Sequence, residues 1–286
     1  MNLKTFGGIP EEYTDPANAS IFLTSIPYDG TSTWGKGANK GFEAFLEAAD
    51  NMELYDIETD SEVYKKGIFI SEPILANKSP EALFIATYNK TLSLLKTDKF
   101  LTFFGGEHSI SIGVIKAFYE KYKDLTVLQL DAHTDLRPSY EGSAYNHACA
   151  VYDASLNTNL IQIGIRSMDS SEKKYWHKEK CFLAQAIKGR HQWMDESIAL
   201  LTDKVYITLD LDVFDPAVMP STGTPEPGGL NWYEVIQYLQ RVFTEKEVVG
   251  FDIVELAPIA NNKAPDFLVA KLYYKMLSYK FQPNDK

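Results

Sequence analysis

Short apolar runs alternate with longer segments of helical spacing along almost the whole chain, and this alternation restricts the possible folds more than any other feature. The runs have the continuous apolar character of strands that are buried on both faces. They are Ile21–Pro27, Lys99–Phe104, Thr126–Leu130, Leu160–Ile165, Val205–Leu211 and Val248–Val254. The helical segments are Pro80–Leu95, Ser109–Tyr122, Trp193–Leu201, Asn231–Phe243 and Pro265–Tyr279. Such alternation predicts an α/β fold of three layers, with helices on both faces of a mostly parallel central sheet.

The sequence predicts a single domain that spans residues 1–286. The length of 286 residues would allow two domains, but single α/β domains often reach this size. No linker rich in Pro and Ser, or in charge, interrupts the chain. The one dense turn region is Pro216–Gly229, and a loop of this length in a compact domain usually has a function.

The charge balance argues against two classes of partner. The chain has 28 Lys and Arg against 39 Asp and Glu, a net charge of −11, and no basic cluster stands out. Nucleic acids and anionic membranes usually require a basic face, so we expect neither as a partner, whereas a cationic substrate suits this field. Met1–Pro10 lacks the pattern of a signal peptide, and no apolar run approaches the ~20 residues that span a bilayer, so we expect a cytoplasmic protein. Cys149 and Cys181 cannot form a disulfide framework, and we interpret both as buried thiols.

Polar residues follow four of the predicted strands at the point where each strand ends. In an open parallel sheet, ligands bind beyond the carboxyl ends of the strands. The four polar groups are Gly-Gly-Glu-His-Ser at 105–109, Asp-Ala-His-Thr-Asp at 131–135, Asp-Leu-Asp at 210–212 and Glu255. We therefore expect them to converge on one rim of the sheet.

These groups contain four carboxylates and two imidazoles that could bind metal. Alternation with a period of two sends the side chains of each acidic motif to one side. The six residues are His108, Asp131, His133, Asp135, Asp210 and Asp212. Buried together without a countercharge, the carboxylates would repel one another by several kcal/mol, so a cation is required. Carboxylate mixed with imidazole and no thiolate suits Mn²⁺, with Fe²⁺, Co²⁺, Ni²⁺ or Zn²⁺ as substitutes, and six ligands allow two ions.

Each of these residues also has a simpler interpretation. An isolated Asp at a strand end is most often a helix cap or a turn former, and a single His in a Gly-Gly loop is more often structural. Two alternating acidic motifs together with two histidines, all at the ends of separate strands, favour the metal site over these alternatives.

Several ordered segments resemble the successive motifs of the ureohydrolases, the family of arginase, agmatinase and their relatives. They are Gly-Gly-Glu-His-Ser at 105–109, Asp-Ala-His-Thr-Asp at 131–135, Ser-Ala-Tyr-Asn-His-Ala-Cys at 143–149 and Leu-Asp-Leu-Asp-Val-Phe-Asp-Pro at 209–216. The resemblance covers nearly the whole chain, from the Gly-Lys-Gly-Ala loop at 35–38 to Asp-Ile-Val-Glu at 252–255. It implies the fold shared by arginases and deacetylases and a homo-oligomer, commonly a trimer or hexamer.

The resemblance implies two Mn²⁺ per chain. One ion would be held by His108, Asp131, Asp135 and Asp210, and the other by Asp131, His133, Asp210 and Asp212. Two ions a few ångströms apart lower the pKa of a bridging water, so that hydroxide can attack the carbon of a guanidinium group at neutral pH. Asp135 would accept a hydrogen bond from this hydroxide and orient it.

The resemblance also assigns two residues to the substrate. Glu255 would bind the guanidinium group through its carboxylate, and His147 would shuttle a proton to the leaving amine. The alternatives are a surface acid at a strand end and a loop or core histidine. Arg166, which follows a strand, could face the same rim or form a structural salt bridge.

The substrate is expected to be agmatine, cleaved to urea and putrescine in polyamine biosynthesis. The segments 136–149 and 220–230 look more like those of agmatinases than of arginases. The early loop departs from the family at Asn-Lys-Gly-Phe, residues 39–42, so aminopropylagmatine, guanidinobutyrate, arginine and formiminoglutamate stay open. Two other classes of protein are the alternatives. A non-catalytic metal-binding homologue would have lost a ligand or His147, and a deacetylase of the related fold would use one zinc and lack the second Asp-x-Asp motif.

Overall fold

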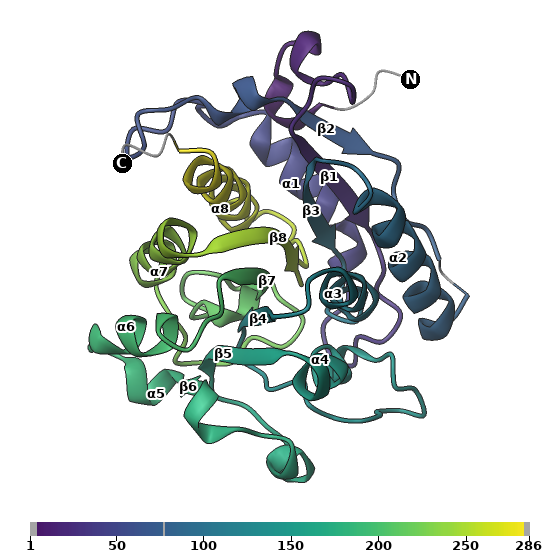
Figure 1. Ribbon diagram of the computed structural model, residues 1–286, viewed down its shortest axis with the longest axis vertical. Helices are drawn as coiled ribbons and strands as arrows, with labels where there is room; N and C mark the ends of the chain where they lie inside the picture. The colour runs from purple at the N-terminus through teal and green to yellow at the C-terminus, as the bar shows by residue number, and fades with distance from the viewer. Residues whose placement is uncertain (1–4, 77, 283–286) are drawn as a thin grey trace.

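The computed structural model describes residues 5–76 and 78–282, and one sheet of eight parallel strands forms its centre (Figure 1). Every pair of neighbouring strands is parallel. The strand order is β2-β1-β3-β8-β7-β4-β5-β6. The strands are β1 (Ile21–Ile26), β2 (Ile68–Ser71), β3 (Phe100–Gly105), β4 (Leu125–Leu130), β5 (Asn159–Ile165), β6 (Cys181–Leu183), β7 (Lys204–Asp210) and β8 (Glu247–Val254).

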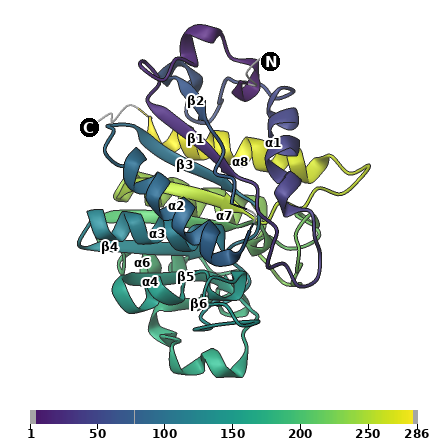
Figure 2. The ribbon, with the colours of Figure 1, turned by 90° about the vertical axis from the view of Figure 1, so that its right-hand side faces the viewer.

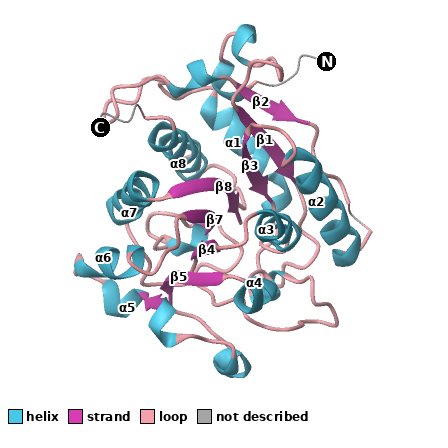
Figure 3. Cartoon of the chain, in the orientation of Figure 1, coloured by secondary structure: helices cyan, strands magenta, loops and turns pink. Residues whose placement is uncertain are grey.

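Helices cover both faces of this sheet (Figures 2 and 3). The helices are α1 (Gly41–Ala49), α2 (Pro80–Leu94), α3 (Ile110–Lys121), α4 (Tyr152–Asn157), α5 (Ala184–Ile187), α6 (Gln192–Ile198), α7 (Trp232–Glu245) and α8 (Ala264–Lys280). One apolar core lies under α1, α6, α7 and α8, and a second lies under α2, α3 and α4. The predicted three-layer α/β/α architecture is therefore confirmed. Within the described residues, no helix is both long enough and apolar enough to cross a membrane.

All six predicted strands and all five predicted helices are present, with ends that differ by a few residues. The prediction missed the two edge strands, β2 and β6, and the helices α1, α4 and α5. The edge strands have four and three residues and include half-buried side chains, so neither has the continuous apolar run of a central strand. Helix α1 begins at Gly41 without a side-chain cap, so no start pattern marks it in the sequence.

The four strands that carry the predicted polar groups are adjacent, in the order β3-β8-β7-β4. Their side chains are almost entirely buried, as expected of a parallel sheet covered on both faces. Because parallel strands end at the same edge, the loops after these four strands meet. The predicted convergence on one rim is confirmed by the contacts described below.

Candidate active site

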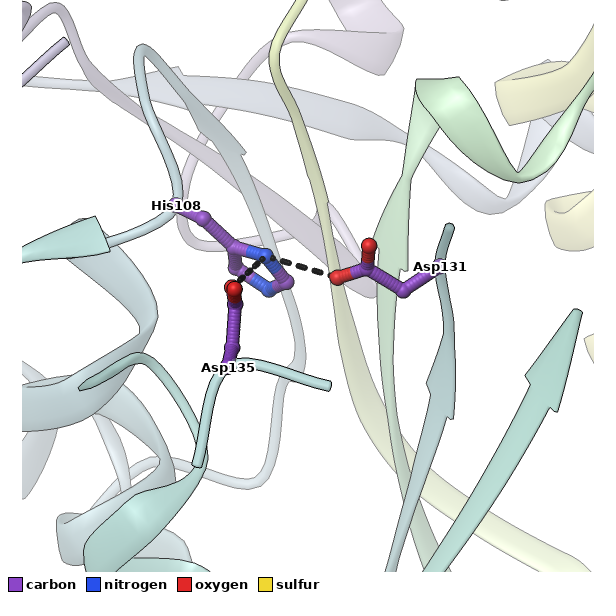
Figure 4. A group of neighbouring side chains, drawn as sticks. All are labelled: His108, Asp131 and Asp135. Atoms are coloured by element: carbon purple, nitrogen blue, oxygen red, sulfur yellow. Dashed lines mark ion pairs between the residues drawn. The ribbon is translucent and has the colours of Figure 1, made fainter. Parts of the chain in front are cut away.

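The first cluster of side chains surrounds the imidazole of His108. Its Nδ1 lies 3.1 Å from Asp131 Oδ2, 3.2 Å from Asp135 Oδ2 and 3.3 Å from Asp210 Oδ2. His108 comes from the loop after β3, Asp131 and Asp135 follow β4, and Asp210 ends β7. All four residues are buried. Figure 4 shows the imidazole of His108 between the carboxylates of Asp131 and Asp135.

A second cluster shares Asp131 with the first. His133 Nδ1 lies 2.9 Å from Asp212 Oδ2 and 3.6 Å from Asp131 Oδ1. The two clusters His108–Asp131–Asp135 and Asp131–His133–Asp212 each bring three potential ligand atoms close enough to bind one metal ion. Asp131 therefore stands between two candidate metal positions.

Backbone amides orient three of these carboxylates. Asp131 Oδ1 accepts a hydrogen bond of 2.6 Å from the backbone N–H of His133, and Asp210 Oδ1 accepts one of 2.9 Å from that of Asp212. Asp212 Oδ1 accepts one of 3.0 Å from the backbone N–H of Ala132. In each case the second oxygen, Oδ2, lies within 3.3 Å of a histidine Nδ1, and Asp131 Oδ1 also lies 3.6 Å from His133 Nδ1. The loops thus direct one oxygen of each carboxylate toward the candidate metal positions.

The charges at this site fit a divalent cation. Among the described residues, the buried Nδ1 of His108 has no hydrogen-bond partner, although three carboxylate oxygens surround it. Burial, together with the charge of Asp131, raises the pKa of Asp135 to about 7. Burial and the charges of Asp212 and Asp131 raise the pKa of Asp210 well above its ordinary value. The buried carboxylates repel one another when all are ionised, and the imidazole nitrogen beside them has no partner. A site for Mn²⁺ or a similar ion is expected to have such donors.

A buried chain of hydrogen bonds holds the His108 ring at Nε2, on the side away from the three carboxylates. His108 Nε2 lies 2.8 Å from Thr208 Oγ1, and the Thr208 hydroxyl donates to Asp252 Oδ1 at 2.7 Å. Tyr206 donates its hydroxyl to Asp252 Oδ2 at 2.7 Å. Because the single hydroxyl proton of Thr208 goes to Asp252, the Nε2 atom of His108 must be the donor, and Nδ1 keeps its lone pair for a metal.

The second histidine has a more open environment. The Nε2 atom of His133 lies 3.8 Å from Glu226 Oε1, and the two side chains are 25% and 37% exposed. Glu226 belongs to the predicted loop 216–229, which therefore reaches the site. Arg166 holds this loop: its guanidinium donates to the backbone carbonyls of Glu226 and Pro227.

The sequence left open whether Arg166 faces the rim or forms a structural salt bridge, and its contacts show a third arrangement. Its guanidinium also donates to the backbone carbonyl of Asp212 at 2.6 Å, and it forms no ion pair in the described part of the chain. Arg166 therefore ties the loop 216–229 to the segment that carries Asp212. Asp215 shapes the same loop by accepting hydrogen bonds from the backbone N–H groups of Ala217 and Gly228.

Glu255 and Asp135 both adopt left-handed backbone conformations, with φ of 69° and 50°. Such conformations cost free energy in residues other than glycine and often occur at functional sites. Glu255 Oε1 accepts a hydrogen bond of 2.9 Å from the backbone N–H of His108, which holds the carboxylate beside a residue of the first cluster. Burial, together with the charge of Glu107, raises the pKa of Glu255 well above its ordinary value. A cationic ligand next to Glu255 would relieve this cost.

His147 begins a short 3₁₀ turn, His147–Cys149, that is capped by the side chain of Asn146. Burial lowers the pKa of His147 to about 4. Its ring lies edge-on to Tyr140, and its Nδ1 lies 3.1 Å from Thr31 Oγ1. Cys149, in the same turn, is a buried free thiol like Cys181, as predicted.

One cavity of ≈ 170 Å³ unites the predicted residues. Asp131 and Asp212 lie beside it through their contacts with the two histidines of the clusters. The other six line it: His108, His133, Asp135, His147, Asp210 and Glu255. Larger cavities, of ≈ 370, ≈ 400 and ≈ 760 Å³, lie elsewhere, and none of the eight predicted residues is among their described linings.

The early loop that departs from the family pattern lies close to this site. Gly35 donates its backbone N–H to the carbonyl of Gly223 at 3.1 Å. A Cβ atom on Gly41 would stand only 2.5 Å from the backbone oxygen of Leu256, so the start of α1 packs directly against the residue after Glu255. A Cβ atom on Gly223 would stand 3.4 Å from Glu255 Oε2, so the early loop and the loop 216–229 both pack beside Glu255.

Four polar residues at the site were missed by the sequence analysis: Thr31, Glu107, Thr208 and Asp252. Thr208 and Asp252 are direct partners in the pairing of β7 with β8, and both interrupt apolar runs. A polar residue inside a buried strand is the pattern that could have identified them. Glu107 and Asp252 both belong to motifs of the resemblance but have no assigned role there, and the contact of Glu107 with Thr31 joins residues 76 positions apart.

Comparisons with known proteins agree with this geometry. A sequence model described as the arginase family matches residues 19–278. The N(1)-aminopropylagmatine ureohydrolase of Synechocystis sp. is 37% identical over 280 residues, which cover 94% of this chain and 92% of that protein. The agmatinase of Pyrococcus horikoshii is 30% identical over 266 residues, or 92% of this chain and 93% of that protein. The crystal structure of the agmatine ureohydrolase of Thermoplasma volcanium matches with a TM-score of 0.85 and 27% identity, covering 98% of this chain and 95% of that one. The chain therefore belongs to the arginase family and is a ureohydrolase.

Proposed function

We propose that this protein uses two metal ions to hydrolyse a guanidino compound with an amine-bearing tail, releasing urea and a polyamine. The observation that carries the proposal is the pair of His and Asp clusters that share Asp131 beside one cavity. Glu255 and His147 line the same cavity, so a guanidinium-binding carboxylate and a proton carrier lie beside the metal positions.

The metal ligands of the proposal are those that the sequence predicts, with Mn²⁺ as the expected ion. One ion would be held by His108, Asp131, Asp135 and Asp210, and the other by Asp131, His133, Asp210 and Asp212. When bound, two such ions would supply hydroxide at neutral pH as the nucleophile of the reaction. Asp135 would accept a hydrogen bond from the attacking hydroxide and direct its lone pair at the guanidinium carbon.

Glu255 would bind the guanidinium head. A carboxylate matches the planar, forked N–H donors of this group, and the hydrogen bond from the His108 amide leaves Glu255 Oε2 free to accept them. The left-handed backbone at Glu255 fixes this orientation at the end of β8. His147 would hold a proton at one ring nitrogen and deliver it to the amine as the carbon–nitrogen bond breaks.

The walls of the cavity support an amine tail over a carboxylate tail. Arg137 is the one Arg or Lys in the described lining of the cavity. Its Nε donates a hydrogen bond of 3.1 Å to Glu172 Oε1, so this charge is already paired. The guanidinium of Arg137 also lies over the ring of Tyr140, 4.2 Å from its centroid. No free basic side chain in this lining therefore awaits the carboxylate of arginine or guanidinobutyrate, whereas Asp169 and Glu172 make the field negative.

We propose N1-aminopropylagmatine as the substrate, with agmatine as the second candidate. The sequence motifs favour agmatinases over arginases, and the Synechocystis relative, at the higher identity, is named for aminopropylagmatine. Agmatine is supported by the Pyrococcus relative and by the Thermoplasma structure. The chemistry at the guanidinium is the same for both, with urea and a triamine or urea and putrescine as products.

A urea-release assay with Mn²⁺ tests this proposal. The panel is N1-aminopropylagmatine, agmatine, arginine and 4-guanidinobutyrate. We expect kcat/KM for both amine-tailed compounds to exceed that for arginine by roughly 30-fold or more, because a carboxylate desolvated without partners costs about 2–5 kcal/mol. Equal or better turnover of arginine or guanidinobutyrate would contradict the amine-tail proposal. Release of urea from none of the four would contradict the proposed function.

A further inference from the structure

The hydroxyl of Thr31 lies between His147 and a fully buried carboxylate, that of Glu107. Thr31 Oγ1 is 2.8 Å from Glu107 Oε1 and 3.1 Å from His147 Nδ1. The backbone N–H of His147 donates to the same Thr31 oxygen at 3.0 Å. Thr31 itself is buried, so solvent does not compete for these hydrogen bonds.

Glu107 is surrounded by hydrogen-bond donors. It accepts from the backbone N–H of Thr31 at 3.2 Å and from its hydroxyl at 2.8 Å. It also accepts from the backbone N–H of Ser109 at 2.7 Å and from its hydroxyl at 2.9 Å. Each oxygen accepts from a backbone N–H, Oε1 from Thr31 and Oε2 from Ser109, and such donors favour the ionised carboxylate, which has no proton to give. The hydroxyl proton of Thr31 is therefore directed at Glu107.

This arrangement determines which nitrogen of His147 carries the proton. A threonine hydroxyl has one proton and two lone pairs. Since the proton points to Glu107 and the backbone N–H of His147 uses one lone pair, the second lone pair can only accept from His147 Nδ1. Neutral His147 then carries its proton on Nδ1, and Nε2, for which the described residues provide no hydrogen bond, keeps a lone pair.

We propose that Thr31 and Glu107 are positioning residues that hold His147 in the tautomer with Nε2 free to carry the catalytic proton. The inference rests on the proposed role of His147 as the proton carrier. In this scheme Nε2 gains a proton from water and passes it to the departing amine, while the Nδ1 proton stays in its hydrogen bond to Thr31. The carboxylate of Glu107 stabilises the charged imidazolium through the oriented hydroxyl.

The spectroscopic test reads the tautomer directly. The chain has five histidines, so ¹⁵N-histidine NMR of the protein loaded with diamagnetic Zn²⁺ gives few signals, and loss of one signal in His147→Gln assigns it. We expect the wild-type proton on Nδ1, a loss of this preference in Thr31→Val, and its retention in Thr31→Ser. A wild-type proton on Nε2, or the same tautomer in Thr31→Val as in wild type, would overturn the proposal.

The kinetic test separates positioning from folding. We expect Thr31→Val to lower kcat by roughly 10- to 100-fold, part of the usual gain from general acid catalysis, with KM and bound metal nearly unchanged. Thr31→Ser should recover most of kcat. Thr126→Val is the matched control. Thr126 is also buried, and its hydroxyl is hydrogen-bonded to that of Thr202 at 2.8 Å, but it lies at the start of β4, whereas the site lies beyond the end of this strand.

Failure of this inference and failure of the proposed function give different results. If the wild-type protein releases no urea from any guanidino compound, the proposed function fails while the NMR result still decides the tautomer. If the wild type is active and Thr31→Val keeps the wild-type kcat, the positioning role is wrong and the hydrolytic function stands.

Discussion

The two histidines of the metal clusters are held in opposite ways, although each directs Nδ1 at a shared carboxylate. His108 is buried, and its Nε2 donates into the chain formed by Thr208, Asp252 and Tyr206. His133 is one quarter exposed, and its Nε2 has only the long contact of 3.8 Å to Glu226. We call the cluster around His108 the inner half of the site and the cluster of His133 and Asp212 the outer half. Asp131 belongs to both halves. The comparison indicates that the fold preorganises the inner half, whereas a loop borders the outer half.

This difference has a consequence for metal binding. Partners of the non-coordinating nitrogen fix the orientation and tautomer of a metal-binding histidine. The inner half has a complete chain of such partners within buried strands, and the outer half depends on the loop 216–229, which Arg166 holds through backbone carbonyls. We therefore expect the inner ion to bind more tightly and a chelator to remove the outer ion first.

Removal of the carboxylate that both halves share should have the largest effect. Asp131→Ala deletes a ligand from each cluster, so we expect loss of most bound metal and of nearly all urea release. Asp212→Ala, which touches only the outer half, is the matched variant and should empty chiefly one position. Elemental analysis and the urea assay measure both. Full metal occupancy and full activity in Asp131→Ala would contradict the shared site.

Breaking the support of the inner histidine should have the next largest effect. Thr208→Val keeps the shape of the side chain but removes the acceptor of His108 Nε2. We expect metal affinity to fall roughly 10- to 100-fold, as is usual when such a partner is lost. Titration of the metal-free protein with Mn²⁺ measures the change. Unchanged affinity for both ions would show that the buried chain does not hold His108 in its metal-binding orientation.

The fold and the inner ligands were predictable because their information is local. Apolar runs identify β4 and β7, and the residues that follow each run are placed at the rim by strand geometry alone. The Thr208–Asp252 contact was not predictable, because it depends on the register between β7 and β8. The hydrogen bond of Thr31 to Glu107 likewise joins two loops that only the folded sheet brings together.

Metal should change how stability depends on pH. In the metal-free protein, burial and the charge of Asp131 raise the pKa of Asp135 to about 7. The folded state then binds this proton more tightly than the unfolded state, whose Asp pKa is ~3.9, so the free energy of unfolding falls as pH rises between these values. The two pH units between pH 5 and the raised pKa of Asp135 correspond to about 3 kcal/mol, so we expect the Tm of metal-free protein to be higher at pH 5 than at pH 8 by roughly 5–10 °C, with a larger gain from Mn²⁺ at pH 8. A metal-free protein that is more stable at pH 8 would contradict this assignment.

The smallest effect is expected at the exposed partner of the outer histidine. Glu226→Gln removes a charge that contacts His133 only at 3.8 Å, from a side chain that is 37% exposed. Contacts between exposed charges contribute about 0–1 kcal/mol, so affinity for the outer ion should fall by no more than roughly fivefold. Mn²⁺ titration compares this variant with Thr208→Val. A larger loss in Glu226→Gln than in Thr208→Val would reverse the order of the two halves.

The central claim is that two metal positions sharing Asp131 act together in guanidine hydrolysis. Stepwise addition of Mn²⁺ to the metal-free protein, with bound metal and urea release followed on the same samples, tests it most directly. We predict two ions bound per chain, the first without appreciable activity and the second accompanied by urea release from an amine-tailed guanidine. Full activity with one bound ion, or binding of only one ion per chain at saturation, would contradict the claim.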